Sequence, residues 1–322
     1  MPGARGGAGI GSGLTEDKVE HRPVLVEEVT SFLAQGKGLY LDATTGGGGH
    51  AARLLDALPA EARLLALDRD PAALERARVR LAPYGDRVLL MHRPFDQLGE
   101  VLSSERLGSL AGALFDLGLS SLQLGDADRG FAFSREGTLD LRFDPTAGAP
   151  AHRLLGTASA ETLARWFAEY GELPQSHRLA RSIVEFRASH PILTTGDLRR
   201  AVARVWGDTP HPRRLAQLFQ ALRIAVNDEL ATVERGLDAA IEALAPGAVL
   251  AVISYHSLED RLVKRVLRGP LPGKREAQLG APRPDRRLEP VTRKAIVPTP
   301  SEVAQNPRAR SAKLRVARRI AA

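Results

Sequence analysis

A short apolar segment at residues 38–42 runs directly into the glycine-rich stretch 44–50, and this junction constrains the fold more than any other feature of the chain. Glycines at the end of a strand let the backbone approach a ligand, and the start of the next helix offers free N–H groups. Residues 51–58 continue with leucines at helical spacing. Strand, glycine loop and helix together predict the opening half of a βαβ unit.

The same alternation continues after this unit. Further apolar segments predict strands at 63–67, 87–91 and 110–115. Each of these strands ends at or near an acidic residue, namely Asp68, Asp96 and Asp116. A proline at position 71 marks the start of the helix that follows the first of them. Strands that alternate with helices predict a parallel sheet with both faces covered.

The alternation stops after the fourth strand, where about a hundred residues show helical periodicity alone. The expected helices of this insertion are 160–169, 178–189 and 195–205. The later elements are expected to be one long helix at 216–244, a strand at 248–254, a helix at 258–267 and strands at 294–297 and 313–320. We expect the last strand to run antiparallel to its neighbour. This order matches the class I (Rossmann-like) methyltransferase fold: an α/β, seven-stranded, mostly parallel sheet with helices on both faces, plus an inserted all-helical domain.

These patterns also predict the domain boundaries. They are a disordered leader at 1–20, a sheet domain built from 21–125 and 224–322, and an inserted helical substrate-recognition domain at 126–223. The leader has six glycines among its first thirteen residues and no apolar core for a signal peptide. No later apolar run approaches the roughly 20 residues of a membrane span. We therefore expect a cytoplasmic protein without membrane contact.

Composition narrows the chemistry and indicates a partner. The chain has no cysteine, which excludes disulfides, zinc–cysteine clusters and thiolate nucleophiles, and we expect no metal centre. Residues 261–322 hold 17 Lys or Arg against 4 Asp or Glu, whereas the rest of the chain holds 28 against 34. A basic segment on a mildly acidic body fits a polyanion such as RNA, because phosphate contacts gain from counterion release. A solvated arginine-rich tail would have the same composition.

The glycine loop indicates a nucleotide-like ligand but leaves its identity open. Residues 47–52 satisfy the G-x-G-x-x-A pattern of dinucleotide-binding proteins, so a nicotinamide cofactor is one alternative and a ligand-free glycine turn is another. Asp68 follows Gly49 by 19 residues, which suits an acceptor for ribose hydroxyls. Phe95 and Asp96 could cover an adenine and accept from its amino group, although Phe95 could equally belong to the core. A terminal antiparallel strand pair and a basic tail favour S-adenosylmethionine.

A series of motifs in fixed order resembles the ribosomal RNA small subunit methyltransferase H (RsmH, formerly MraW) family. The resemblance covers nearly everything after the leader. Its motifs begin at His21-Arg22-Pro23-Val24-Leu25 and include Asp42-Ala43-Thr44, Leu67-Asp68-Arg69-Asp70-Pro71, Asp116-Leu117-Gly118, Arg129-Gly130-Phe131, residues 139–145, Asn227-Asp228-Glu229-Leu230, residues 254–261 and Asn306-Pro307-Arg308-Ala309-Arg310-Ser311. Such a series is far more specific than any single glycine loop.

The resemblance implies a function and a set of cofactor contacts. It implies N4-methylation of a cytidine in the decoding region of 16S rRNA, at cytidine 1402, with S-adenosylmethionine as donor and the small ribosomal subunit as partner. The implied cofactor-binding residues are Gly48, Gly49, His50, Asp68, Phe95, Asp116 and Gln123. Thr45 and Gly47 replace larger or charged residues, and Leu122 replaces a proline, which makes the placement of Gln123 less secure.

The chemistry of the target suggests further residues. Many amino methyltransferases carry Asp/Asn-Pro-Pro-aromatic after the fourth strand, whereas this chain has Asp116-Leu117-Gly118. Our hypothesis is that Asp116 orients donor and target as the catalytic residue, and that Ser254 or His256 lines the target pocket. His256 could equally be a structural histidine bonded within its own turn.

The C-terminal arginines are the candidate RNA contacts. We expect Arg308 and Arg310 to bind the RNA substrate, with charge added by residues 313–319. The segments 129–131 and 140–145 could form a substrate lip or serve domain packing. The sequence leaves open a catalytically silent RNA-binding protein, the choice between naked RNA and assembled subunit, and the choice between a monomer and a homodimer.

Overall fold

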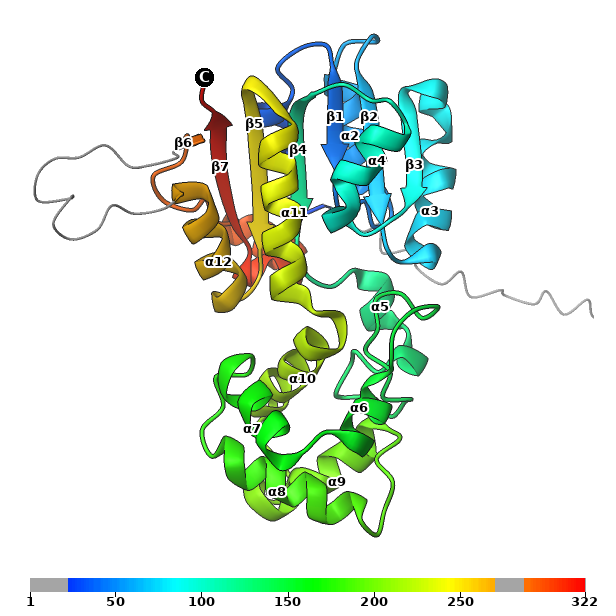
Figure 1. Cartoon of the computed structure of the whole chain (residues 1–322), viewed down its shortest axis with the longest axis vertical. Helices are drawn as coiled ribbons and strands as arrows, with labels where there is room; N and C mark the ends of the chain where they lie inside the picture. Colours follow the sequence, from blue (N-terminus) through cyan, green and yellow to red (C-terminus); the bar gives the residue numbers. More distant parts are fainter. Residues whose placement is uncertain (1–22, 270–286, 322) are drawn as a thin grey trace, which may run out of the picture.

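The computed structural model describes residues 23–269 and 287–321, so the predicted leader at 1–20 lies outside the described residues. Its centre is a seven-stranded sheet in the order β3-β2-β1-β4-β5-β7-β6 (Figure 1). The strands are β1 Leu39–Asp42, β2 Arg63–Asp68, β3 Val88–His92, β4 Leu110–Asp116, β5 Leu244–Ser254, β6 Leu288–Pro290 and β7 Lys313–Arg319. Strands β1 to β5 pair in parallel, and β7 lies antiparallel between β5 and β6. The predicted fold class is confirmed.

Helices cover both faces of this sheet because its inner strands are apolar on both sides. One core cluster joins the sheet to α1 (Val26–Leu33), α2 (Gly49–Ala57) and α3 (Pro71–Leu81). The other joins it to α4 (Leu98–Ser104), α11 (Glu229–Ala243) and α12 (Ser257–Arg268). This doubly wound arrangement brings the carboxyl ends of β1, β2, β4 and β5 to one edge, which is where ligands of such sheets bind. None of the helices in the described ranges is long and apolar enough to cross a membrane.

A helical body follows β4 and packs around its own core cluster. It consists of α5 (Ser121–Gly125), α6 (Ala151–Thr157), α7 (Ala160–Glu169), α8 (Ser176–Arg187), α9 (Thr195–Trp206) and α10 (Pro212–Asn227). Figure 1 shows these helices beyond the carboxyl ends of the parallel strands. The three helices expected here match α7, α8 and α9 within two residues at each end. The boundaries 126 and 223 themselves stay a prediction.

The single helix expected at 216–244 is wrong, because the chain breaks at Asp228. That residue has a φ of +47° and ends α10, and α11 begins at the next residue. The apolar periodicity continues through the break, because both helices have a buried apolar face. The apolar face of α10 packs in the helical body, and that of α11 packs against the sheet. Asn227 and Asp228 are residue types that tolerate the left-handed region, so their pairing was the local signal for the break.

The strand expected at 294–297 is also wrong. In this segment Ile296 makes only an isolated bridge to Leu314, and Val297 is 59% exposed. The edge strand is instead β6, where Leu288 is buried and anchors the pairing with β7. Pro290 ends this strand, as a proline can at a sheet edge. The antiparallel final strand β7 is confirmed.

The remaining described elements are short turns and one C-terminal helix. They are η1 (Ala82–Arg87), η2 (Phe95–Gln97), η3 (Ala127–Arg129), α14 (Pro300–Gln305) and η4 (Pro307–Ser311). The main chain of Leu25, just before α1, donates to the carboxylate of Glu302 in α14 at 2.8 Å. This bond joins the segment before α1 to α14 beside the glycine loop.

Candidate active site

The glycine loop between β1 and α2 packs tightly against the protein. Gly48 has a φ of +78° at the N-terminus of α2, and a Cβ there would lie 3.4 Å from the Cα of Ala77. A Cβ on Gly49 would lie 2.7 Å from the Cγ of Pro23. Packing therefore accounts for both glycines, and their predicted cofactor contacts stay a prediction. Gly47, by contrast, faces open space.

Three carboxylates lie at the carboxyl ends of neighbouring strands: Asp42 on β1, Asp68 on β2 and Asp116 on β4. Asp68 accepts from the main-chain N–H of Gly46 at 2.7 Å and of Asp70 at 2.9 Å. Burial raises the pKa of Asp68 above its ordinary value. The predicted ribose acceptor thus lies against the glycine loop and not toward bulk solvent.

Asp116 has neighbours from two other parts of the chain. The hydroxyl of Tyr255 donates to its Oδ1 at 2.8 Å, and Nε2 of His50 lies 3.4 Å from its Oδ2. Burial, followed by the charge of Asp116, raises the pKa of Tyr255 well above its ordinary value. Tyr255 therefore remains a hydrogen-bond donor at neutral pH and fixes one carboxylate oxygen.

Unpaired polar atoms are concentrated in this region. Five buried side-chain N or O atoms within the described residues lack a hydrogen-bond partner. Four of them belong to the site: Oδ2 of Asp42, both ring nitrogens of His50 and Oγ of Ser254. Because buried polar groups are nearly always paired, these atoms indicate a polar ligand. The three carboxylates beside these atoms favour a cationic ligand and disfavour the pyrophosphate of a dinucleotide.

The ionisation of Asp42 makes a testable difference to stability. Burial raises its pKa to about 7, whereas an aspartate in the unfolded chain has a pKa of about 4. Its contribution to stability is fully present below pH ~4 and is lost as the pH rises through about 7. We expect the free energy of unfolding to fall by roughly 3–4 kcal/mol over this range, at about 1.4 kcal/mol per tenfold change in proton affinity.

Urea unfolding of the wild type and of Asp42→Asn at several pH values measures this contribution. The variant should lose most of the decline between pH 4 and 7, because its amide does not titrate. Identical pH profiles for the two proteins would contradict a raised pKa at Asp42.

Phe95 and Asp96 lie beside the site but already have partners. The Phe95 ring meets Phe115 edge-on at 5.3 Å, and a Cβ on Gly236 of α11 would lie 2.3 Å from it. Asp96 accepts from the guanidinium of Arg235 at 2.9 Å. Phe95 therefore packs against the core, as the alternative interpretation held, and its contact with an adenine stays a prediction.

Gln123 reaches the three carboxylates only through Asp70, whose main-chain N–H donates to Asp68. It is buried, and its amide donates to Asp70 at 2.9 Å while its oxygen accepts from the main chain of Ser120. The same oxygen of Asp70 accepts from Arg129 at 2.6 Å. Gln123 is thus placed near the end of β2, and its contact with the cofactor stays a prediction.

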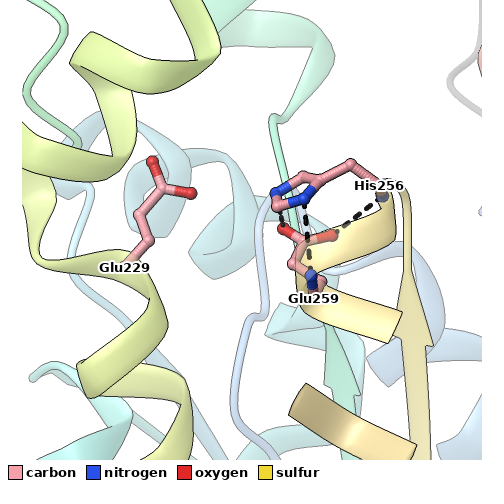
Figure 2. Close-up of side chains that lie close together, drawn as sticks. All are labelled: Glu229, His256 and Glu259. Carbon is pink, nitrogen blue, oxygen red and sulfur yellow. Dashed lines mark hydrogen bonds and ion pairs between the residues drawn. The ribbon is translucent and has the colours of Figure 1, made fainter. Parts of the chain in front are cut away.

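His256 belongs to an ion-pair network at the start of α12. Its Nδ1 accepts from the main chain of Glu259 at 3.4 Å, and its Nε2 lies 3.0 Å from a Glu259 carboxylate oxygen. Figure 2 shows Glu229, on α11, across from these two residues. The three could together ligate a metal by distance, but Arg223 donates to both oxygens of Glu229, at 2.7 and 2.8 Å, and supplies the positive charge.

The C-terminal basic residues divide into two groups. Arg308 and Arg310 of η4 are exposed. Lys313 and Arg315, by contrast, both contact Asp260 of α12, at 3.4 and 2.7 Å. Part of the charge that suggested an RNA-binding tail is therefore used to hold β7 and α12 together.

Tyr255 and Asp42 are site residues that the sequence patterns did not predict. Tyr255 follows β5, and a Cβ on Gly118, whose φ is +107°, would lie 3.0 Å from its ring. An aromatic ring therefore lies beside Asp116 and Gly118, but it comes from the residue after β5. An aromatic residue at the end of the strand beside β4 was the available signal.

Comparison with known proteins agrees with the resemblance seen in the motifs. A family model described as the MraW methylase family matches residues 18–320. Similar proteins named ribosomal RNA small subunit methyltransferase H occur in Thermomicrobium roseum, at 46% identity over 94% of this chain and 94% of that protein, and in Magnetococcus marinus, at 43% identity over 94% and 99%. One from Acidothermus cellulolyticus is 46% identical over 94% of both chains. The chain therefore belongs to the MraW methylase family.

Proposed function

We propose that this protein transfers the methyl group of S-adenosylmethionine to the N4 amino group of a cytidine in 16S rRNA of the small ribosomal subunit. The family membership and the names of the relatives support a methylase of small-subunit rRNA. The family resemblance further suggests cytidine 1402 as the target. The observation that carries the proposal is the cluster of three carboxylates, Asp42, Asp68 and Asp116, beside unpaired buried polar atoms at the glycine loop.

The residues present fit this donor. Asp68 would accept from the ribose hydroxyls, with the glycine loop and Phe95 around the nucleoside. Asp42 and Asp116 would face the positively charged part, where their charge is complementary to a cation. When bound, the donor supplies an electrophilic methyl group on its sulfonium. A nicotinamide dinucleotide would bring its negative pyrophosphate toward the same carboxylates.

The protein's own residues would then position the amine. The lone pair of a cytosine amine is delocalised into the ring, so the amine must be held in line with the methyl group, and such alignment is worth roughly 7–11 kcal/mol in favourable cases. Asp116 would accept one N–H of the amine while the Tyr255 hydroxyl fixes the other oxygen of its carboxylate. The absence of cysteine favours amine over C5 methylation, because C5 methylation generally needs a thiol nucleophile.

A direct test compares ligands and products. Calorimetry should detect binding of S-adenosylmethionine and none of NAD. The enzyme should methylate small subunits purified from a strain that lacks the activity, and mass mapping should place the new methyl group on a cytidine amine. Binding of NAD instead of S-adenosylmethionine would overturn the donor assignment. Tight subunit binding without methyl transfer would favour a silent RNA-binding protein.

Arg308 and Arg310 are the exposed candidates for phosphate contacts. Deleting the basic run would remove β7, which lies between β5 and β6, so substitution is the better test. We expect Arg308→Gln/Arg310→Gln to weaken subunit binding and to lower the slope of log affinity against log salt by about 1–2, since each phosphate contact contributes close to one. Filter binding over a salt series measures this slope.

A matched control lies at the other edge of the sheet. Arg76 and Arg78 are exposed on α3, beside β3 (Figure 1). Replacing both with glutamine removes the same charge, and we expect it to change the salt slope little. An equal loss of slope in the control pair would show a general charge effect and remove the specific role of η4.

A further inference from the structure

The turn after β2 joins the proposed donor site to the helical body. Asp68 accepts from the main-chain N–H of Asp70 at 2.9 Å, so the ribose acceptor and this turn share one carboxylate. Asp70 is almost fully buried at 1% exposure, and its Oδ1 caps α3 by accepting from Ala72 at 3.1 Å. Its other oxygen, Oδ2, receives the two donors from the helical body, Gln123 and Arg129.

Arg129 extends this connection into the segment 141–144. One of its terminal nitrogens contacts Asp70 at 2.6 Å, and the other donates to the carbonyls of Arg142 and Phe143 at 2.8 and 2.7 Å. Its side chain is only 14% exposed, so contact with RNA is not its main role. The planar guanidinium has donors in a fixed fork, which lets one side chain hold both partners in a defined geometry.

The same segment has further contacts with the edge of the sheet. The Arg69 guanidinium lies 4.2 Å from the centre of the Phe143 ring, and His92 of β3 lies 3.4 Å from Asp144. Asn227, at the break between α10 and α11, accepts from the main-chain N–H of Phe143 and donates to the carbonyl of Leu141. Phe143 stacks on Phe131 within the core of the helical body. These contacts favour a packing role for the segments 129–131 and 140–145 over a substrate lip.

We propose that the helical body recognises the RNA substrate, and that the buried Asp70–Arg129 ion pair couples donor binding at Asp68 to this recognition. The inference rests on the proposed function. Ribose hydroxyls on Asp68 would fix the carboxylate that holds the Asp70 main chain, and Asp70 in turn orients Arg129 and the segment it supports. Because coupling between two binding sites is reciprocal, RNA bound to the helical body tightens donor binding by the same factor. Arg129 acts here as a positioning residue.

Equilibrium dialysis with the full chain tests this coupling. The probes are labelled S-adenosylhomocysteine, with and without saturating unmethylated small ribosomal subunits. In the wild type the subunits should lower the Kd of S-adenosylhomocysteine about tenfold, within the range usual for coupled sites. Arg129→Gln should bind each ligand alone but bring this ratio below about twofold. Asp70→Asn, which keeps the cap of α3, should have the same effect.

The control variant is Arg142→Gln. Arg142 pairs with Asp140 at 2.7 Å within the same segment, with no ion pair to the turn after β2. The Arg142→Gln protein should retain the tenfold ratio between the Kd values without and with subunits. Should Arg129→Gln fail to show a cooperative melting transition, Arg129→Lys keeps the charge near Asp70 but cannot reach both carbonyls, and its ratio should fall to about two- to fourfold.

Three results would overturn the inference: no tightening in the wild type, an unchanged ratio in the Arg129 variants, or an equal loss in Arg142→Gln. Failure of the proposed function would look different, because the wild type would then not bind S-adenosylhomocysteine or not methylate the subunits. If the wild type binds S-adenosylhomocysteine and methylates the subunits, but the Arg129 variants keep the wild-type ratio of Kd values, only this inference is removed.

Discussion

We expect the Asp116→Ala enzyme to transfer methyl groups at least about a hundredfold more slowly than the wild type. A positioned acid–base group typically contributes 10²–10⁴-fold, and a single hydrogen-bond partner of the reacting group contributes a similar amount in a desolvated site. Asp116, at the end of β4, accepts from the Tyr255 hydroxyl and lies 3.4 Å from Nε2 of His50. Single-turnover transfer to small subunits at saturating donor measures the effect.

Two companion variants separate catalysis from folding. Tyr255→Phe keeps the ring over Gly118 and removes only the hydroxyl that holds Asp116, so we expect a rate about tenfold lower with donor affinity nearly unchanged. His256→Ala removes the cap of α12, so we expect lower stability and a transfer rate within a few-fold of the wild type. A near wild-type rate for Asp116→Ala would remove its catalytic role, and a large rate loss in folded His256→Ala would favour a target-pocket role.

The second large effect is expected in stability, at Arg223. Replacing it with methionine should lower the free energy of unfolding by about 3–5 kcal/mol, because removal of one partner leaves buried charge uncompensated. Arg223 is 8% exposed, donates two hydrogen bonds to the Glu229 carboxylate and lies 3.9 Å from the Glu259 carboxylate. Burial opposes its charge, yet Glu229 and Glu259 together raise the pKa of Arg223 above its ordinary value. Urea unfolding monitored by circular dichroism gives the measurement.

An exposed ion pair provides the matched control for this variant. Arg265 contacts Glu234 at 2.8 Å with both side chains about half exposed or more, and exposed pairs contribute at most about 1 kcal/mol. Arg265→Met should therefore have little effect. Replacing Glu229 with leucine in the Arg223→Met background should recover part of the loss, since an apolar pair avoids the burial of an unpaired carboxylate. A loss below about 1 kcal/mol in Arg223→Met would contradict the buried network.

Local patterns in the sequence were enough for the order of the main elements and for the position of the ligand edge. The alternation of strands and helices, the glycine loop after β1 and the acids ending β2 and β4 all depend on residues within a few positions of one another. The start of α3 at Pro71 and the extent of α7 followed for the same reason. The family followed from motifs in fixed order, which no single element could have shown.

Only the tertiary structure decided which side chains meet. Tyr255 reaches Asp116 across 139 positions, and Arg129 reaches Asp70 across 59, so neither pair leaves a periodic signal. The break at Asp228 was missed because the apolar spacing is the same for one helix on one core and for two helices on two cores. The edge strand β6 was missed because apolar spacing does not show whether a strand has a partner. Hydrophobic patterns indicate which face of an element is buried. They do not indicate what packs on that face or which group pairs with a buried charge, because those contacts join distant parts of the chain.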